Sequence, residues 1–266
     1  TKIEIGGKIT GKEENLGYVL YNLNKLKEIT VDANNETFRS VDGVLYSADG
    51  SVLLRYPSAR EEKVYEVPEG VTELDYRAFA VSDLEEVKLP ATLEEIGEFA
   101  FIDCMELKKI TVDANNETFQ SVDGVLYSAD GSELLQYPSA RKEKIYEVPE
   151  GVIRLKNNAL RSSGLEEVKL PATLEGIGEY AFLYCIELKE ITVDANNETF
   201  QSVDGVLYSA DGSELLKYPS AKEGKVYEVL EGVTRLEVNA FGDSDLEEVK
   251  LPDSLEEIKK YAFVRC

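Results

Sequence analysis

One stretch of the chain returns three times at a constant interval. The segment LKEITVDANNETF begins at Leu26, a near-identical segment begins at Leu107, and the same letters return at Leu188. Both intervals are 81 residues, and most of the sequence between the copies recurs in step. Self-similarity at a fixed period is typical of solenoids, in which each repeat buries its apolar face against its neighbours. We therefore expect a repeat array whose core grows along one axis.

Each 81-residue super-repeat divides into three coils, and the segment LEEVKLPATLEEIGEFAFIDCME of residues 84–106 shows their plan. Val87 and Leu89 alternate with Glu86 and Lys88, which is the period of a half-buried strand. Pro90 then ends the strand, because proline cannot donate a hydrogen bond to a sheet. The letters FAF and a cysteine follow with a roughly helical spacing, which predicts one short turn before the next strand.

The coil pattern resembles a known family. The letters LxxVxLPxxLxxIGxxAFxxCxxL of residues 84–107 recur at 165–188 and 246–266, and they are similar to the BspA-like leucine-rich repeats of bacterial and some protozoan surface proteins. A second motif, SVDGVLYSADGSxLLxYP, occupies residues 40–57, 121–138 and 202–219 and looks like an insert common in that family. The resemblance implies a secreted or wall-attached adhesion or interaction module.

The expected fold is a right-handed leucine-rich-repeat solenoid, mostly β with short helical turns and a parallel sheet along one face. It should contain about ten coils. We expect a single domain of residues 1–266, made of a degenerate coil (1–25) and three super-repeats (26–106, 107–187 and a truncated 188–266). In the degenerate coil, Ile3 and Ile5 should lie in a strand, and Leu16–Leu20 should replace the IGxxAF segment. Because the chain opens with Thr1 and ends inside a repeat, we expect it to be cut from a longer array.

The insert motif predicts one β-hairpin in each super-repeat. Asp49-Gly50 lies between two β-rich runs, and this dipeptide is a strong hairpin signal. The three hairpins are expected to project from one side of the solenoid. Tyr46 and Tyr56 should cover the coil surface, and the alternative is that they are exposed and bind a ligand.

The three cysteines follow the same period. Cys104, Cys185 and Cys266 are 81 residues apart, so stacked coils at about 4.8 Å would separate them by about 15 Å. A disulfide needs Cα atoms within about 7 Å, and we therefore expect free, buried thiols. A metal or redox site would need clustered Cys or His, and the chain contains no His.

Charge and composition exclude several classes of partner. A formal net charge of −23 argues against nucleic acid and anionic membranes, which both need a basic patch. No apolar run approaches the roughly 18 residues of a membrane span, so no membrane insertion is expected. A hydrophobic content of 43% is ordinary for a folded chain.

We find no chemistry that would make the chain an enzyme or give it a cofactor. No histidine can act as a base, and glutamates that recur in every repeat have the same environment each time. The segment VDANNE of residues 31–36 groups oxygen ligands but lacks the spacing of a calcium loop. Asn34 and Asn35 are expected to bond to backbone in a turn, and the glycosylation sequon that begins at Asn35 is expected to be incidental.

The outer row of the predicted parallel sheet supplies the candidate binding residues. Adjacent strands present Glu beside Lys, and such cross-strand pairs contribute ~0.2–1 kcal/mol each. A neighbouring row mixes glutamates with a periodic apolar residue, as in Val64. One interpretation is a solvated, charge-balanced face, and the other is a ligand-binding face, since solenoids bind on extended surfaces. The candidates are Glu66, Lys88, Glu147, Lys169, Glu228 and Lys250.

Three functions remain open. The first is a non-enzymatic protein-binding or adhesion module of a bacterial cell-surface or secreted protein, whose partner is a host or bacterial surface protein or, alternatively, a glycan. The second is a structural spacer that presents another domain. The third is a carbohydrate-binding accessory module of a larger secreted enzyme. The resemblance implies an extracellular or cell-wall location. Segments 75–83, 156–164 and 237–245 differ most among the copies and are expected to be loops.

Overall fold

The computed structural model describes residues 1–10, 19–20 and 23–266 of the chain. These residues form a β-solenoid of about 11 turns, close to the ten coils expected, with almost no helix. The leucine-rich-repeat solenoid is thus confirmed. Residues 16–18 of the predicted degenerate coil lie outside the described residues, and the strand predicted at Ile3 and Ile5 is present.

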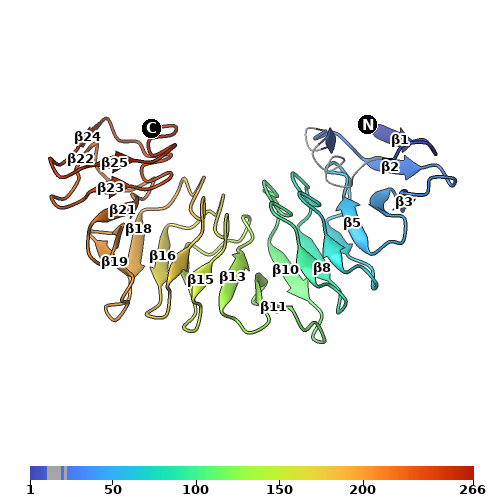
Figure 1. The fold of residues 1–266 in the computed structure, drawn as a ribbon, viewed down its shortest axis with the longest axis horizontal. Helices are drawn as coiled ribbons and strands as arrows, with labels where there is room; N and C mark the ends of the chain where they lie inside the picture. The colour runs from blue at the N-terminus through green and yellow to red at the C-terminus, as the bar shows by residue number, and fades with distance from the viewer. Residues whose placement is uncertain (11–18, 21–22) are drawn as a thin grey trace. The chain divides into compact units, whose positions relative to one another are not determined.

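The chain divides into two compact units, and the expectation of a single domain stays a prediction. Unit 1 comprises residues 1–130 and 138–140, and unit 2 comprises residues 131–137 and 141–266. The strands of unit 1 (Figure 1) are β1 (Lys2–Ile5), β2 (Glu28–Val31), β3 (Phe38–Val41), β4 (Val44–Ser47), β5 (Val52–Arg55), β6 (Val64–Glu66), β7 (Glu73–Leu74), β8 (Glu86–Leu89), β9 (Glu95–Ile96), β10 (Lys109–Val112), β11 (Phe119–Val122) and β12 (Val125–Ser128).

Unit 2 continues the same plan. Its strands are β13 (Glu133–Gln136), β14 (Ile145–Glu147), β15 (Arg154–Leu155), β16 (Glu167–Leu170), β17 (Gly176–Ile177), β18 (Glu190–Val193), β19 (Phe200–Val203), β20 (Val206–Ser209), β21 (Glu214–Lys217), β22 (Val226–Glu228), β23 (Arg235–Leu236), β24 (Glu248–Lys250) and β25 (Glu257–Ile258).

The strands predicted from alternating residues pair in parallel, and we call them the outer ladder. In unit 1, β1 pairs with β2, and β8 lies between β6 and β10. In unit 2, β16 lies between β14 and β18, and β22 pairs with β24. Val87 and Leu89 are buried while Lys88 between them is exposed. The predicted parallel sheet and its inward residues are confirmed.

A second parallel ladder was not predicted. It contains β5, β7 and β9 in unit 1, and β13, β15 and β17 followed by β21, β23 and β25 in unit 2. The strands contributed by the shorter coils are two residues long, and in β7, β15 and β23 the second residue is buried in the core, as Leu74 is with no exposed surface.

Each insert contains more structure than the predicted hairpin. β4 pairs antiparallel with β5 across Asp49-Gly50, as predicted, and β20 pairs with β21 in the same way. An earlier hairpin joins β3 to β4 through Asp42 and Gly43, whose φ angles of 49° and 78° are those of a type I′ turn.

The prediction that the inserts project from the solenoid is wrong. All four residues of β4 are buried, because Val44, Leu45 and Tyr46 carry apolar side chains on both faces of the strand. Tyr46 and Tyr56 are 2% and 1% exposed. Their covering role is confirmed, and the alternative of exposed tyrosines that bind a ligand is wrong.

The single short turn predicted over the FAF letters and the cysteine, before the next strand, is a series of successive hydrogen-bonded turns. Ile102 N donates to Phe99 O over 2.9 Å, and both Phe99 and Asp103 adopt left-handed backbone angles, which prevent a continuous helix. Cys104, at the end of this turn, donates from Sγ to Phe79 O over 3.1 Å. Burial raises the pKa of the Cys104 thiol to about 11.

The thiols are free, as predicted. Cys104 and Cys185 are buried, but the expectation of burial is wrong for Cys266, which is exposed although its Sγ also donates to a backbone carbonyl, Phe241 O, over 3.2 Å. Among the described residues, no helix is both long and apolar enough to cross a bilayer.

Candidate binding surfaces

The six predicted binding residues lie on the outer ladder, paired two by two. Glu66 is the register partner of Lys88, Glu147 of Lys169, and Glu228 of Lys250. All six side chains are exposed. Lys88 Nζ lies 3.5 Å from Glu66 Oε2, and Lys250 Nζ lies 3.8 Å from Glu228 Oε2. Lys169 instead lies 4.0 Å from Glu167 on its own strand.

The neighbouring row of the outer ladder carries exposed apolar residues. Val64 faces Glu86, Ile145 faces Glu167, and Val226 faces Glu248 in register. The three apolar residues, Val64, Ile145 and Val226, are 47%, 54% and 54% exposed. Each unit therefore exposes single apolar side chains that lie among the glutamates and lysines of the outer ladder.

The ion pairs of the outer ladder are worth little to the fold. Lys109 lies 3.0 Å from Glu86, and Lys250 lies 3.8 Å from Glu228, but the lysine side chains are 49% and 54% exposed. Exposed pairs of this kind contribute about 0–1 kcal/mol. The face can therefore change its charges without unfolding the protein.

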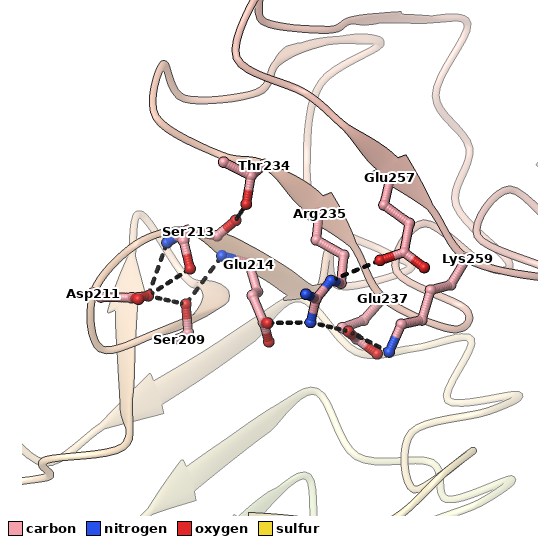
Figure 2. Close-up of polar contacts among 9 residues, drawn as sticks. All are labelled: Ser209, Asp211, Ser213, Glu214, Thr234, Arg235, Glu237, Glu257 and Lys259. Carbon is pink, nitrogen blue, oxygen red and sulfur yellow. Dashed lines mark hydrogen bonds and ion pairs between the residues drawn. The ribbon is translucent and has the colours of Figure 1, made fainter.

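Unit 2 also contains a groove that sequence reasoning missed. Its volume is about 660 Å³, and it is lined by four segments: residues 177–183, 214–217, 235–239 and 257–260, with Leu207. The second ladder places Arg235 between Glu214 and Glu257 in register. Figure 2 shows Arg235 bonded to both carboxylates, with Nη1 2.5 Å from Glu214 Oε1 and Nε 2.9 Å from Glu257 Oε2.

A second pair extends this charged cluster. Lys259 Nζ lies 2.9 Å from Glu237 Oε1, and the same oxygen is 3.9 Å from Arg235 Nη1. Lys260 Nζ lies 3.8 Å from Glu179 Oε2, so that an ion pair joins the segment after β17 to the segment after β25. The ion pairs of this cluster therefore join side chains that come from several strands and from the segments that follow them.

A compact turn fixes the start of β21 beside the groove (Figure 2). Asp211 Oδ1 accepts hydrogen bonds from Ser209 Oγ at 2.6 Å and from Ser213 N at 3.0 Å. Glu214 N donates to Ser209 Oγ over 3.0 Å. These hydrogen bonds lower the pKa of Asp211 to about 2. The turn thereby sets where the Glu214 side chain enters the groove.

One of the cations that line the groove is buried. Lys217 is 3% exposed and donates from Nζ to Gly242 O at 2.7 Å and Asn239 O at 3.3 Å. Burial lowers its pKa to about 8. In the first super-repeat, Arg55 takes this position and donates to Arg77 O and Ala80 O. The sequence signal is a polar residue in an otherwise apolar strand.

The second asparagine of each VDANNE segment is tied to backbone, as predicted for Asn35, whose Nδ2 donates to Gly6 O and Ile9 O. The prediction is wrong for Asn34, whose Nδ2 donates to the Asp32 carboxylate instead. Asn116 Nδ2 donates to Pro90 O and Leu93 O at 2.8 and 2.9 Å, and its Oδ1 accepts from Thr118 N and Phe119 N. Because its amide nitrogen bonds the preceding coil, the sequon offers no free acceptor for a glycan. No group of three or more metal-binding side chains occurs among the described residues.

Comparisons with known proteins agree with this architecture. Six copies of the BspA type leucine rich repeat region match residues 61–122, 140–204 and 222–266, which is more than half of the chain. The chain belongs to this family.

Solved structures show the same fold. A leucine rich cell surface protein from Faecalibacterium prausnitzii A2-165 is 24% identical over 100% of this chain and 76% of its own, with a TM-score of 0.58. A leucine-rich repeat protein from Eubacterium ventriosum ATCC 27560 is 14% identical over 98% of this chain and 88% of its own, with a TM-score of 0.51.

A third likeness is to the pneumococcal vaccine antigen PcpA, at 23% identity and a TM-score of 0.48. It includes 86% of this chain but 56% of that one, so the chain spans just over half the length of the PcpA structure. No curated protein sequence matches the chain.

Proposed function

We propose that this chain is a non-enzymatic protein-binding module and that the outer ladder is its binding face. The observation that carries the proposal is that Val64 in unit 1, and Ile145 and Val226 in unit 2, are each about half exposed beside charged residues of the outer ladder. A partner that covers them gains the burial of apolar surface. The neighbouring Glu–Lys pairs supply electrostatic complementarity, which acts on specificity and association rate.

The module belongs outside the bacterial cell, in a surface-attached or secreted protein. Support comes from the family and from the Faecalibacterium structure, which is named a cell surface protein. An adhesive role follows, with a host or bacterial surface protein as the partner. The acidic chain, with a net charge of −23, is expected to avoid nucleic acid and anionic membranes.

Interferometry with immobilised matrix proteins, mucins and polysaccharides, at low and high salt, tests the proposal. The expected result is saturable binding to one protein that weakens as salt rises, since exposed charges are screened within about 8–10 Å. Binding that persists unchanged at high salt would remove the Glu–Lys rows from the interface.

A structural spacer is the second candidate, favoured by the fact that the lysines Lys2, Lys88, Lys109, Lys169 and Lys250 of the outer ladder already have carboxylate partners. A spacer would bind no member of the panel at any concentration. Binding of one protein would exclude it.

A further inference from the structure

The geometry points to a second binding site, the groove of unit 2, and to a neutral oligosaccharide as its ligand. The inference is independent of the outer ladder, because the groove is formed by the second ladder and by the turns that follow β17, β23 and β25. Its volume of about 660 Å³ lies within the range of small-molecule sites.

The charges of the groove cancel, although the chain as a whole is strongly acidic. The net charge of the chain is −23, so an average patch of its surface repels anions and attracts cations. The groove instead balances carboxylates against cations, which removes any net attraction for a charged ligand. Its charged lining residues are Glu179, Glu214, Glu237 and Glu257 with Lys217, Arg235, Lys259 and Lys260.

The ion pairs leave a fixed set of hydrogen-bonding atoms. Glu214 and Glu257 each use one carboxylate oxygen on Arg235, and Glu237 uses Oε1 on both Arg235 and Lys259. Among the described residues, the second oxygens of these carboxylates have no ion-pair partner and are available as acceptors, and Arg235 Nη2 is available as a donor. Sugar hydroxyls both donate and accept. Neighbouring hydroxyls therefore match this alternation of acceptors and donor.

Preorganisation adds to the match. Arg235 is held from both sides by its register neighbours, and Glu214 follows the turn fixed by Asp211. Binding then orders few side chains, and the ordering of side chains is one of the entropic costs of association. Figure 2 shows these side chains gathered on one side of the strands.

Apolar side chains complete the groove. Tyr180 and Ile258 line it, and Ile258 is 48% exposed. A sugar ring presents C–H groups on its faces and hydroxyls at its edge, so one ligand can contact both kinds of surface. A charged peptide would have to break the existing ion pairs to make its own.

The middle super-repeat offers a matched control inside the same unit. Arg154 is the equivalent of Arg235, but its register neighbours are Glu133 and Gly176, so that one flanking carboxylate is missing. Arg154 does not line the groove. Arg154→Gln removes the same charge from the same ladder as Arg235→Gln and leaves the groove unchanged.

The test is a titration of the full chain with neutral gluco-, manno-, galacto- and chito-oligosaccharides, followed by saturation-transfer NMR. We expect one series to bind, Arg235→Gln to weaken binding at least about tenfold, and Arg154→Gln to leave it unchanged. Should Arg235→Gln unfold, Glu257→Gln on the exposed β25 strand serves in its place, with the same expected loss. Unfolding temperatures of all variants are measured alongside.

Three results would overturn the inference. The first is no binding by any neutral series at millimolar concentration. The second is equal binding by Arg235→Gln or Glu257→Gln and by the wild type. The third is competition of the bound sugar by a charged peptide but not by a second neutral sugar. Charge changes at Lys88, Lys169 and Lys250 should leave sugar binding intact, which separates this site from the outer ladder.

Discussion

At some positions of the repeat, neighbouring coils approach so closely that only one residue type fits. A Cβ atom on Gly178 would lie 2.4 Å from Asn157 N and 2.6 Å from the Lys156 carbonyl carbon. Both atoms are backbone, so they cannot move aside without shifting the chain of the preceding coil just after β15. The glycine is therefore required by space, since its backbone does not adopt a left-handed angle.

Gly178→Ala should lower the free energy of unfolding by at least about 2 kcal/mol, as overpacking does. Urea denaturation measures the effect. Gly164→Ala is the control, because no atom lies within 4 Å of a Cβ built there, and its effect should stay below about 1 kcal/mol. Equal effects of the two variants would contradict the close approach.

Val81 carries more backbone strain than its equivalents, because it is the β-branched residue among three with the same left-handed conformation. Its φ angle is 62°, a left-handed value that costs a β-branched residue about 1–2 kcal/mol. Ser162 and Asp243 take the equivalent positions with similar angles. Val81→Asn should raise the free energy of unfolding by about 1 kcal/mol, measured by thermal unfolding. The Ser162→Asn control should raise the free energy of unfolding by less. If Val81→Asn lowers the free energy of unfolding, packing of the valine outweighs the strain.

The buried Lys217 should make stability depend on alkaline pH. Its folded pKa of about 8 is below its ordinary value of 10.5. Between these values the unfolded chain binds more protons than the folded chain, so stability should rise with pH across this window. The control is Lys217→Gln, because Gln136 occupies the equivalent position of the middle super-repeat. Across this pH window the free energy of unfolding of the wild type should rise by on the order of 3 kcal/mol relative to that of Lys217→Gln. Urea denaturation at pH 7.5 and pH 10.5 measures this, and parallel pH curves would contradict it.

At the scale of elements, coils are joined by side chains as well as by ladders. Asn116 bonds two carbonyls of the preceding coil and two amides of its own turn. Asn197 repeats the same four bonds in unit 2. One asparagine thus satisfies backbone groups that the turn would otherwise leave without partners.

Asn116→Ala should lower the free energy of unfolding by about 2–3 kcal/mol, since buried backbone groups lose their partners. Asn115→Ala is the matched control, because Asn115 is exposed and its side chain bonds only Asp113. Its effect should stay within about 0.5 kcal/mol. Chemical denaturation compares the two, and similar losses would show that Asn116 does not tie the coils.

Elements with a clear period could be predicted, and short ones could not. The alternation around Val87 and the proline after it defined the outer ladder correctly. The second ladder was not predicted, because strands such as Glu73–Leu74 contain two residues, which are too few to show a period. The hairpin at Asp42-Gly43 carried the same dipeptide signal as Asp49-Gly50 and could have been found.

Of the two candidate surfaces, the outer ladder could be predicted from the sequence and the groove could not. The register of Glu66 against Lys88 was predictable because it depends only on coil length and strand alternation. The groove was not, because its charged residues Glu179, Glu214, Arg235 and Glu257 come from four separate segments. Only the pairing of β21, β23 and β25 brings three of them together.

At the scale of the whole molecule, the residues that stabilise the fold are separate from the residues proposed to bind a partner. The core consists of apolar side chains repeated in every coil, while the outer ladder carries exposed pairs that contribute little to stability. A change on the outer ladder should therefore alter binding and leave folding intact.

The most direct measurement compares affinity and stability of Lys88→Glu/Lys169→Glu/Lys250→Glu with those of Lys8→Glu/Lys142→Glu/Lys156→Glu, which changes the net charge equally at exposed positions off this row. With the protein partner found by interferometry, the first variant should lose at least about tenfold in affinity. Its unfolding temperature should match that of the second variant, which should still bind. Unchanged affinity in the first variant, or equal loss in both, would contradict the outer ladder as the binding face.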